Sequence, residues 1–170
     1  VRLAALMAFP RGSPLFAVQL LDEAELAQSA RALVDGTGFG PEPLFKAPLY
    51  PVILAAVMTL LGDGWTWGMR VLHALAGALA TAAAVDGARR LLPPGTARIL
   101  AGVAAGVAFG LFAPLIRLEQ AVLLDSLAVA LQSAMVWALI RSRTSPRRAA
   151  WVAAAGAFAA LAWLNRPTVM

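Results

Sequence analysis

Cysteine is absent from this chain and charged residues are scarce. None of the 170 residues is cysteine, which excludes disulfides, thiolate metal ligands and a cysteine nucleophile. Charged residues make up only 14% of the chain and hydrophobic residues 61%, far from the roughly 25% and 45–50% of a soluble domain. A soluble fold of this size has no place to bury so much apolar surface. The composition therefore predicts an integral membrane protein in contact with the lipid bilayer.

Lysine is also scarce, since 13 of the 14 basic residues are arginine and Lys46 is the only lysine. The arginines gather between apolar runs, as topology signals do. A nucleic-acid surface would instead place them on one face with interleaved aromatic residues. We therefore expect no nucleic-acid partner.

The apolar runs predict an all-α fold, a polytopic transmembrane helix bundle. A span takes about 20 apolar residues, and the spans are predicted at 66–86, 98–116, 121–140 and 149–164. Residues 1–9 are too few to cross and are interpreted as the tail of a first span. Since the far end also stops directly after an apolar run, we expect the chain to be a fragment cut at both ends.

The longest polar interval, residues 20–51, is the best candidate for a site, because polar groups of a membrane protein collect where water is. It holds five of the nine acids and the only lysine. Helical spacing predicts a short amphipathic surface helix from about 22 to 35. Asp22 is expected as its N-cap, with Glu23 in the first turn, where the helix dipole favours negative charge.

The segment from Pro48 to Leu61 decides the topology. It is apolar but only 14 residues long, a length at which an interfacial or re-entrant segment is more common than a span. If it stays at the interface, the polar interval lies on the outer side. The other side then carries seven clustered arginines, which is the positive-inside pattern: Arg89, Arg90, Arg98, Arg141, Arg143, Arg147 and Arg148. A crossing segment is the alternative.

This topology gives one domain over 1–170. Residues 10–65 form an outer loop with juxtamembrane surface helices, and residues 66–170 contain the four spans. In the span at 98–116, Gly102, Gly106 and Gly110 form a small-xxx-small pattern that predicts close helix packing.

Several charged residues interrupt the apolar runs. A charge at the bilayer centre costs about 2.5–3.5 kcal/mol, so such residues lie near span ends or have a role. Arg70 and His73 share a helix face that could meet an anionic group; snorkelling of Arg70 and an interhelical hydrogen bond of His73 are the alternatives. Glu119 and Asp125 do not share a face, and either could pair with Arg117 or with another helix.

The acidic pair Asp22 and Glu23 is the best placed for general-base or metal chemistry, because both lie where a surface helix begins at the water boundary. A helix cap is the alternative for this pair. On the proposed topology the pair lies on the same outer side as the charged residues of the spans.

Four segments carry a family resemblance in their order: DEAELAQSARAL, KAPLYPVILAAVMTLLG, GMRVLHALAGALATAAAVDGARRLL and LAWLNRPT. Together they resemble the amino-terminal half of polyprenyl-phosphate-dependent membrane glycosyltransferases of the C-fold group. This group, glycosyltransferase family 39, includes protein O-mannosyltransferases and lipid A aminoarabinose transferases. The resemblance implies a multi-pass protein of the bacterial inner membrane with an extracytoplasmic active site. Its partners would be a polyprenyl-phosphate sugar donor and an unidentified acceptor.

The resemblance also implies roles for single residues. It places the catalytic carboxylate at Asp22, with Glu23 beside it, in an inverting transfer. The residues implied for the donor phosphate are Lys46, Tyr50, Arg70 and Arg166, with His73, Glu119 and Asp125 as further candidates.

A divalent metal ion is left open as a cofactor. Some members of the group bind one through an acid just before the lysine. Phe45 occupies that position here, so a metal site of that kind is not supported. Ala47 also replaces the first proline of the Pro-Pro-Leu motif.

Two other classes of function remain open from the sequence. One is a transporter or flippase segment whose inward polar residues line a path, which an inverted or parallel repeat would favour. The other is a non-catalytic membrane assembly subunit, which the glycine-patterned helix would suit.

Overall fold

The computed structural model describes residues 2, 4, 7, 22–39 and 48–165. The predictions for Lys46 and Arg166, and those for the segment 10–21, fall outside these residues. Over the described part the regular structure is helical throughout, which confirms the all-α class. The helices are α3 (Asp22–Val34), α4 (Leu49–Leu61), η1 (Gly62–Gly64), α5 (Trp65–Arg90), α6 (Thr96–Gly110), α7 (Ala113–Gln120), α8 (Leu124–Thr144) and α9 (Arg148–Asn165).

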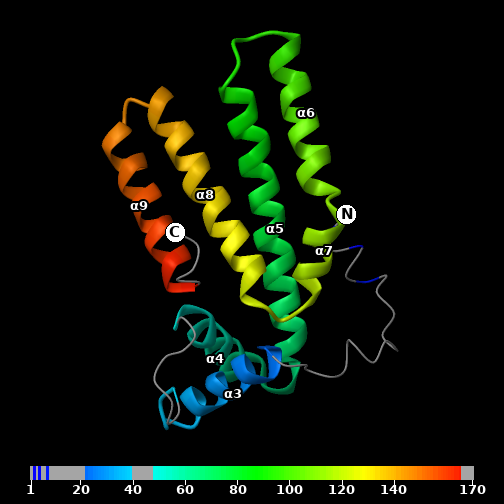
Figure 1. Ribbon diagram of the computed structural model, residues 1–170, viewed down its shortest axis with the longest axis vertical. Helices are drawn as coiled ribbons and strands as arrows, with labels where there is room; N and C mark the ends of the chain where they lie inside the picture. The colour runs from blue at the N-terminus through cyan, green and yellow to red at the C-terminus, as the bar shows by residue number, and fades with distance from the viewer. Residues whose placement is uncertain (1, 3, 5–6, 8–21, 40–47, 166–170) are drawn as a thin grey trace.

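Four helices lie side by side in the order α9, α8, α5, α6 (Figure 1). α5 and α8 run in one direction, and α6 and α9 run in the other. The turns between α5 and α6 and between α8 and α9 therefore lie together at the top of Figure 1, and all seven clustered arginines lie there, as the sequence predicts. We call this the arginine end.

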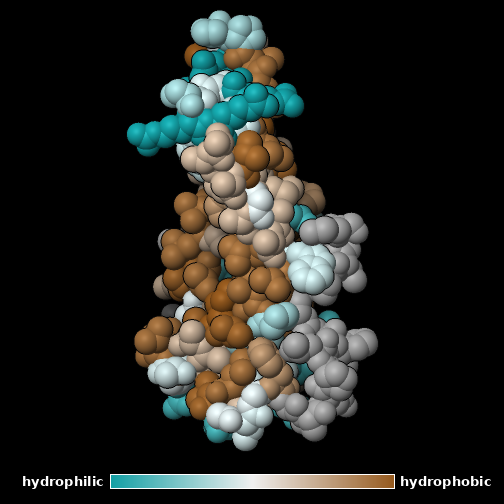
Figure 2. Space-filling model, turned by 90° about the vertical axis from the view of Figure 1, so that its left-hand side faces the viewer, coloured by the Kyte–Doolittle hydropathy of each residue, from teal (hydrophilic) through white to brown (hydrophobic). Residues whose placement is uncertain are grey.

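The surface of the bundle is apolar along its length. In Figure 2 brown side chains cover the middle of the visible face, and teal side chains lie near the top. Within the described part of the chain, two helical stretches are long and apolar enough to cross a membrane, Leu49–Arg90 and Leu124–Thr144, or up to three if α6 and α7 form one bent span. The chain is thus a membrane helix bundle, while a crossing by α9 stays a prediction.

The expected span at 98–116 is wrong in one respect, because it is broken. α6 ends at Gly110 and α7 begins at Ala113, and the two axes are bent by 46°. Phe112 has extended backbone before α7, with Pro114 in the first turn. Proline suits a helix start because it has no N–H to bond, but it cannot continue the ladder of α6.

The next span also begins later than its predicted start at residue 121. α8 starts at Leu124, since Ala121 and Leu123 have extended backbone. We call residues 120–124, where the chain turns from α7 into α8, the corner. It lies at the end of the bundle opposite to the arginine end (Figure 1).

The glycines of α6 pack against α5, as predicted. A Cβ on Gly102 would lie 2.6 Å from Cγ of Arg89, and one on Gly106 would lie 3.1 Å from Cγ2 of Val85. The glycines therefore act by letting two backbones approach closely.

α3 and α4 pack together at the corner end of the bundle (Figure 1). α4 lies beside α3 and not along the four-helix layer, and the interfacial position of 48–61 stays a prediction. The main apolar core is also here, between α3, α4, the start of α5 and the corner. It consists of Leu26, Ala27, Ala30, Tyr50, Leu54, Trp65, Met69 and Val122.

Candidate functional site

The acidic start of α3 is attached to the corner by Glu23. Its Oε1 accepts a hydrogen bond of 2.8 Å from the backbone N–H of Val122, across 99 residues of sequence. Below this contact Leu26, Ala27 and Ala30 are buried in the core. Glu23 and the apolar face of α3 together fix where the helix lies on the bundle.

Asp22 is the first residue of α3, with Glu23 and Glu25 in the same turn. The Asp22 side chain is exposed, whereas Glu23 is half-buried. The two neighbouring carboxylates thus have different surroundings: one faces outward and the other accepts a bond from the corner.

Arg70 and His73 share a face of α5, as predicted, and that face meets the corner. The Nε–H of Arg70 donates to the carbonyl of Gln120 at 2.9 Å. Nδ1 of His73 lies 3.2 Å from the carbonyl of Ala121. Because a carbonyl only accepts, Nδ1 carries the proton of that bond. Two consecutive carbonyls of the corner are therefore held by one face of α5.

Tyr50 completes this arrangement from α4. Its hydroxyl lies 3.3 Å from Nε2 of His73, and it donates there when the ring is neutral, since Nδ1 already carries the proton. Tyr50 and His73 are 0% and 1% exposed. For His73 the interhelical hydrogen bond expected as an alternative is what the structure contains.

Asn165 holds the corner from a fourth helix, and sequence reasoning missed it. Its Nδ2 donates to the carbonyl of Leu124 at 2.8 Å, from the last residue of α9, and the side chain is fully buried. An amide side chain in an apolar, alanine-rich run was the available signal.

Glu119 and Asp125 lie on different helices, α7 and α8, on either side of the corner. Glu119 is 3% exposed and forms an ion pair with Arg2. The sequence left open a pairing with Arg117 or with another helix, and the structure contains the second. Arg117 is exposed. Asp125 lies in the first turn of α8, close enough to Tyr50 to interact with it electrostatically.

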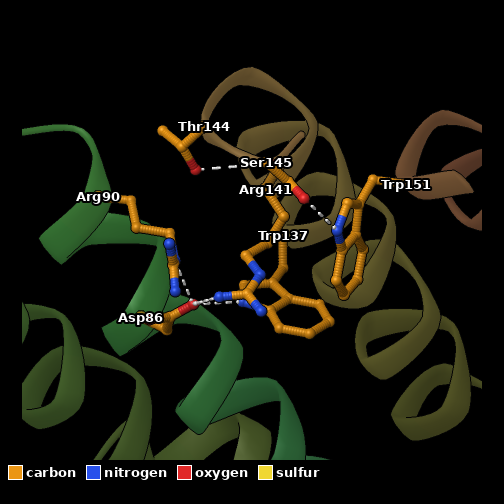
Figure 3. Close-up of polar contacts among 7 residues, drawn as sticks. All are labelled: Asp86, Arg90, Trp137, Arg141, Thr144, Ser145 and Trp151. Carbon is orange, nitrogen blue, oxygen red and sulfur yellow. Dashed lines mark hydrogen bonds and ion pairs between the residues drawn. The ribbon is translucent and has the colours of Figure 1, made fainter. Parts of the chain in front are cut away.

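A second polar cluster lies at the arginine end and was also missed from the sequence (Figure 3). Oδ2 of Asp86 accepts hydrogen bonds from Nε of Arg90 at 2.6 Å and from Nε1 of Trp137 at 2.8 Å. Arg141 lies 3.8 Å from the same oxygen, and its guanidinium lies against the rings of Trp137 and Trp151. Asp86 is the single acid of α5, and it was the signal for this cluster.

No set of three or more His, Asp or Glu residues within the described ranges is placed to hold a metal ion. The divalent ion that the sequence left open as a cofactor stays a prediction. The residues that meet at the corner are instead suited to fixing backbone positions and to presenting one carboxylate at the surface.

The chain matches a known protein family. Residues 45–170 match the model of the dolichyl-phosphate-mannose-protein mannosyltransferase family. The chain belongs to this family. The resemblance seen in the sequence is thereby confirmed, and membership in this mannosyltransferase family assigns the chain to the membrane glycosyltransferases in general. No curated protein and no solved structure matches the chain significantly.

The part that matches the mannosyltransferase family contains Tyr50, Arg70, His73 and the whole corner. Asp22 and Glu23 precede it. The start of α3 and the family-matched part are in contact. The backbone N–H of Val122 donates to Glu23 and so holds α3 on the bundle.

Proposed function

We propose that the chain forms part of a membrane glycosyltransferase that moves a sugar from a polyprenyl-phosphate donor to an acceptor on the extracytoplasmic side. Family membership supports the class of reaction. One observation carries the proposed site: Glu23 bonds to the corner, which sets the exposed Asp22 on the same end of the bundle as Arg70 and opposite to the seven arginines.

The orientation of the proposed site follows from charge. Arginine-rich connections stay on the cytoplasmic side during insertion, so the arginine end is assigned to the cytoplasm and α3 to the outside. In a bacterial cell this is the outer face of the inner membrane, where a lipid-linked sugar donor meets its acceptor.

In the proposed reaction the carboxylate of Asp22 takes the proton of an acceptor hydroxyl. The acceptor oxygen attacks the anomeric carbon from the side opposite to the phosphate, and the bond from that carbon to the phosphate oxygen breaks with inversion. The electron pair leaves with the polyprenyl phosphate. Developing negative charge on this leaving group requires cations nearby, a role we assign to Lys46 and Arg166.

Arg70 and Tyr50 are assigned a position below this surface. Arg70 is 6% exposed and close enough to Glu23 to interact with it electrostatically. It therefore adds positive charge beneath the donor phosphate while holding the corner. Tyr50, which is fully enclosed, supports His73 and through it the same turn.

The two carboxylates are proposed to have different roles. Asp22 is exposed and acts on the acceptor, whereas Glu23 is a positioning residue because its oxygen is bonded to Val122. Replacing Glu23 by glutamine keeps an oxygen that can accept this bond, but replacing Asp22 by asparagine removes the base.

The test compares Asp22→Asn, Glu23→Gln and Glu23→Ala in the full-length protein, reconstituted with membranes and radiolabelled polyprenyl-phosphate mannose, followed by other sugars on the same carrier. We expect Asp22→Asn to lower kcat by about a hundredfold or more, as loss of a general base does, without altered insertion. Glu23→Gln should retain most of the activity that Glu23→Ala loses. Full turnover by Asp22→Asn would overturn the catalytic assignment, and equal losses in both Glu23 variants would overturn the positioning role.

A further inference from the structure

The arginine end has a large excess of positive charge. Seven arginines lie there, and Asp86 is the acid that the described residues bring to them. Asp86 is occupied by Arg90, Arg141 and the indole of Trp137 (Figure 3). Its charge is therefore used within the bundle, where it ties α5 to α8.

Four of the other five arginines of this end are exposed: Arg89, Arg143, Arg147 and Arg148. Arg143 and Arg147 flank the turn between α8 and α9. This turn is held in place because the hydroxyl oxygen of Ser145 accepts hydrogen bonds from the backbone N–H of Arg147 and from Nε1–H of Trp151, each at 3.2 Å. The turn between α8 and α9 thus presents its charges from a fixed backbone.

These charges stand next to exposed apolar side chains. Leu139 and Val152 are 45% and 48% exposed, within two turns of Arg143 and Arg148, and Ile99 beside Arg98 is 59% exposed. Figure 2 shows the same sequence of surfaces, with teal side chains above brown ones. A partner that fits this surface carries negative charge directly beside hydrocarbon.

We infer that the arginine end binds the headgroups of anionic phospholipids, with Arg143, Arg147 and Arg148 on the turn between α8 and α9 as the phosphate contacts. Guanidinium groups pair with phosphate oxygens in a bidentate manner, and the exposed leucines and valines below them meet the acyl chains. An acidic protein or a nucleic acid would match the charges but would leave the neighbouring apolar residues without a partner. The inference does not rest on the proposed transfer reaction.

The test uses the full-length protein in neutral detergent. Binding of phosphatidylglycerol and phosphatidylcholine is compared by native mass spectrometry for the wild type and for the double variant Arg143→Gln/Arg147→Gln. A second double variant, Arg31→Gln/Arg117→Gln, removes two exposed arginines away from this turn and serves as the matched control. Arg143→Lys/Arg147→Lys tests whether charge suffices.

We expect the wild type to prefer phosphatidylglycerol and the first double variant to lose more than tenfold of that preference, since one arginine near an anionic surface contributes about fivefold. The control should keep the preference, and the lysine variant should keep most of it. Equal binding of the two lipids by the wild type would overturn the inference, as would an equal loss in the control.

Two further measurements keep the inference testable if the double variant does not fold. The preference of the wild type should decrease as salt is added, because screening weakens exposed charges. A soluble polyglutamate peptide should not compete with phosphatidylglycerol, because it offers no acyl chains. A salt-independent preference, or full competition by the peptide, would contradict a phospholipid site.

Discussion

The two ends of the bundle are held together in different ways. At the corner, side chains from α3, α5 and α9 bond to main-chain atoms: Glu23 to an N–H, and Arg70, His73 and Asn165 to carbonyls. At the arginine end, side chains bond mainly to one another around Asp86. Main-chain contacts fix a backbone more firmly than contacts between two flexible side chains. The corner end is therefore the better support for an active site.

Among the variants that compare the two ends, His73→Ala is expected to lower the free energy of unfolding most. The change leaves the Ala121 carbonyl and the Tyr50 hydroxyl without their partner and opens a cavity at a residue that is 1% exposed. We expect the free energy of unfolding in mixed micelles to decrease by about 3 kcal/mol. A loss of stability no larger than that of Asp86→Ala at the other end would contradict the view that the corner is held more firmly than the arginine end.

A smaller effect is expected for Gly102→Val. The new side chain would enter the space occupied by the aliphatic part of Arg89, so the Arg89 side chain must be displaced or α6 must move away from α5, at a cost of about 2 kcal/mol. Gly156→Val is the matched control, because a Cβ on Gly156 meets nothing within 4 Å. Thermal unfolding of both variants in detergent checks the difference, and equal shifts in Tm would mean that the glycine face of α6 does not set the helix distance.

The smallest effect is expected for Asp86→Ala. The carboxylate is 40% exposed, so solvent screens its ion pairs, and we expect a loss of about 1 kcal/mol. Asp86→Asn keeps an acceptor for Trp137 and should lose less. The change in indole environment can be followed by tryptophan fluorescence. A loss as large as that of His73→Ala would show that the arginine end is as firmly built as the corner.

The sequence was sufficient to predict the features that depend on local composition. Apolar length located α5, α8 and α9, and the arginine clusters indicated the shared end. The four-residue spacing of Gly102, Gly106 and Gly110 was enough to predict close packing. Each of these signals lies within one segment of the chain.

The corner could not be predicted in the same way. Its contacts join residues that are 41 to 99 positions apart, and four of its bonds use main-chain atoms, which carry no sequence signal. The ion pair of Arg2 with Glu119 has the same character. The break before α7 was a local feature that the prediction missed, although Pro114 indicated it.

Arg2 determines where α6 lies along the axis of α5. Glycines repeated every four residues determine how closely α6 approaches α5, but they offer no polar group that bonds to α5 at one position along the helix axis. Nη2 of Arg2 bonds at once to Oγ1 of Thr81 on α5 and to the carbonyl of Phe109 on α6, at 3.0 and 2.8 Å. The guanidinium of Arg2 thus connects α5 and α6 directly. It fixes the position of one helix along the other, which the glycines alone leave undetermined.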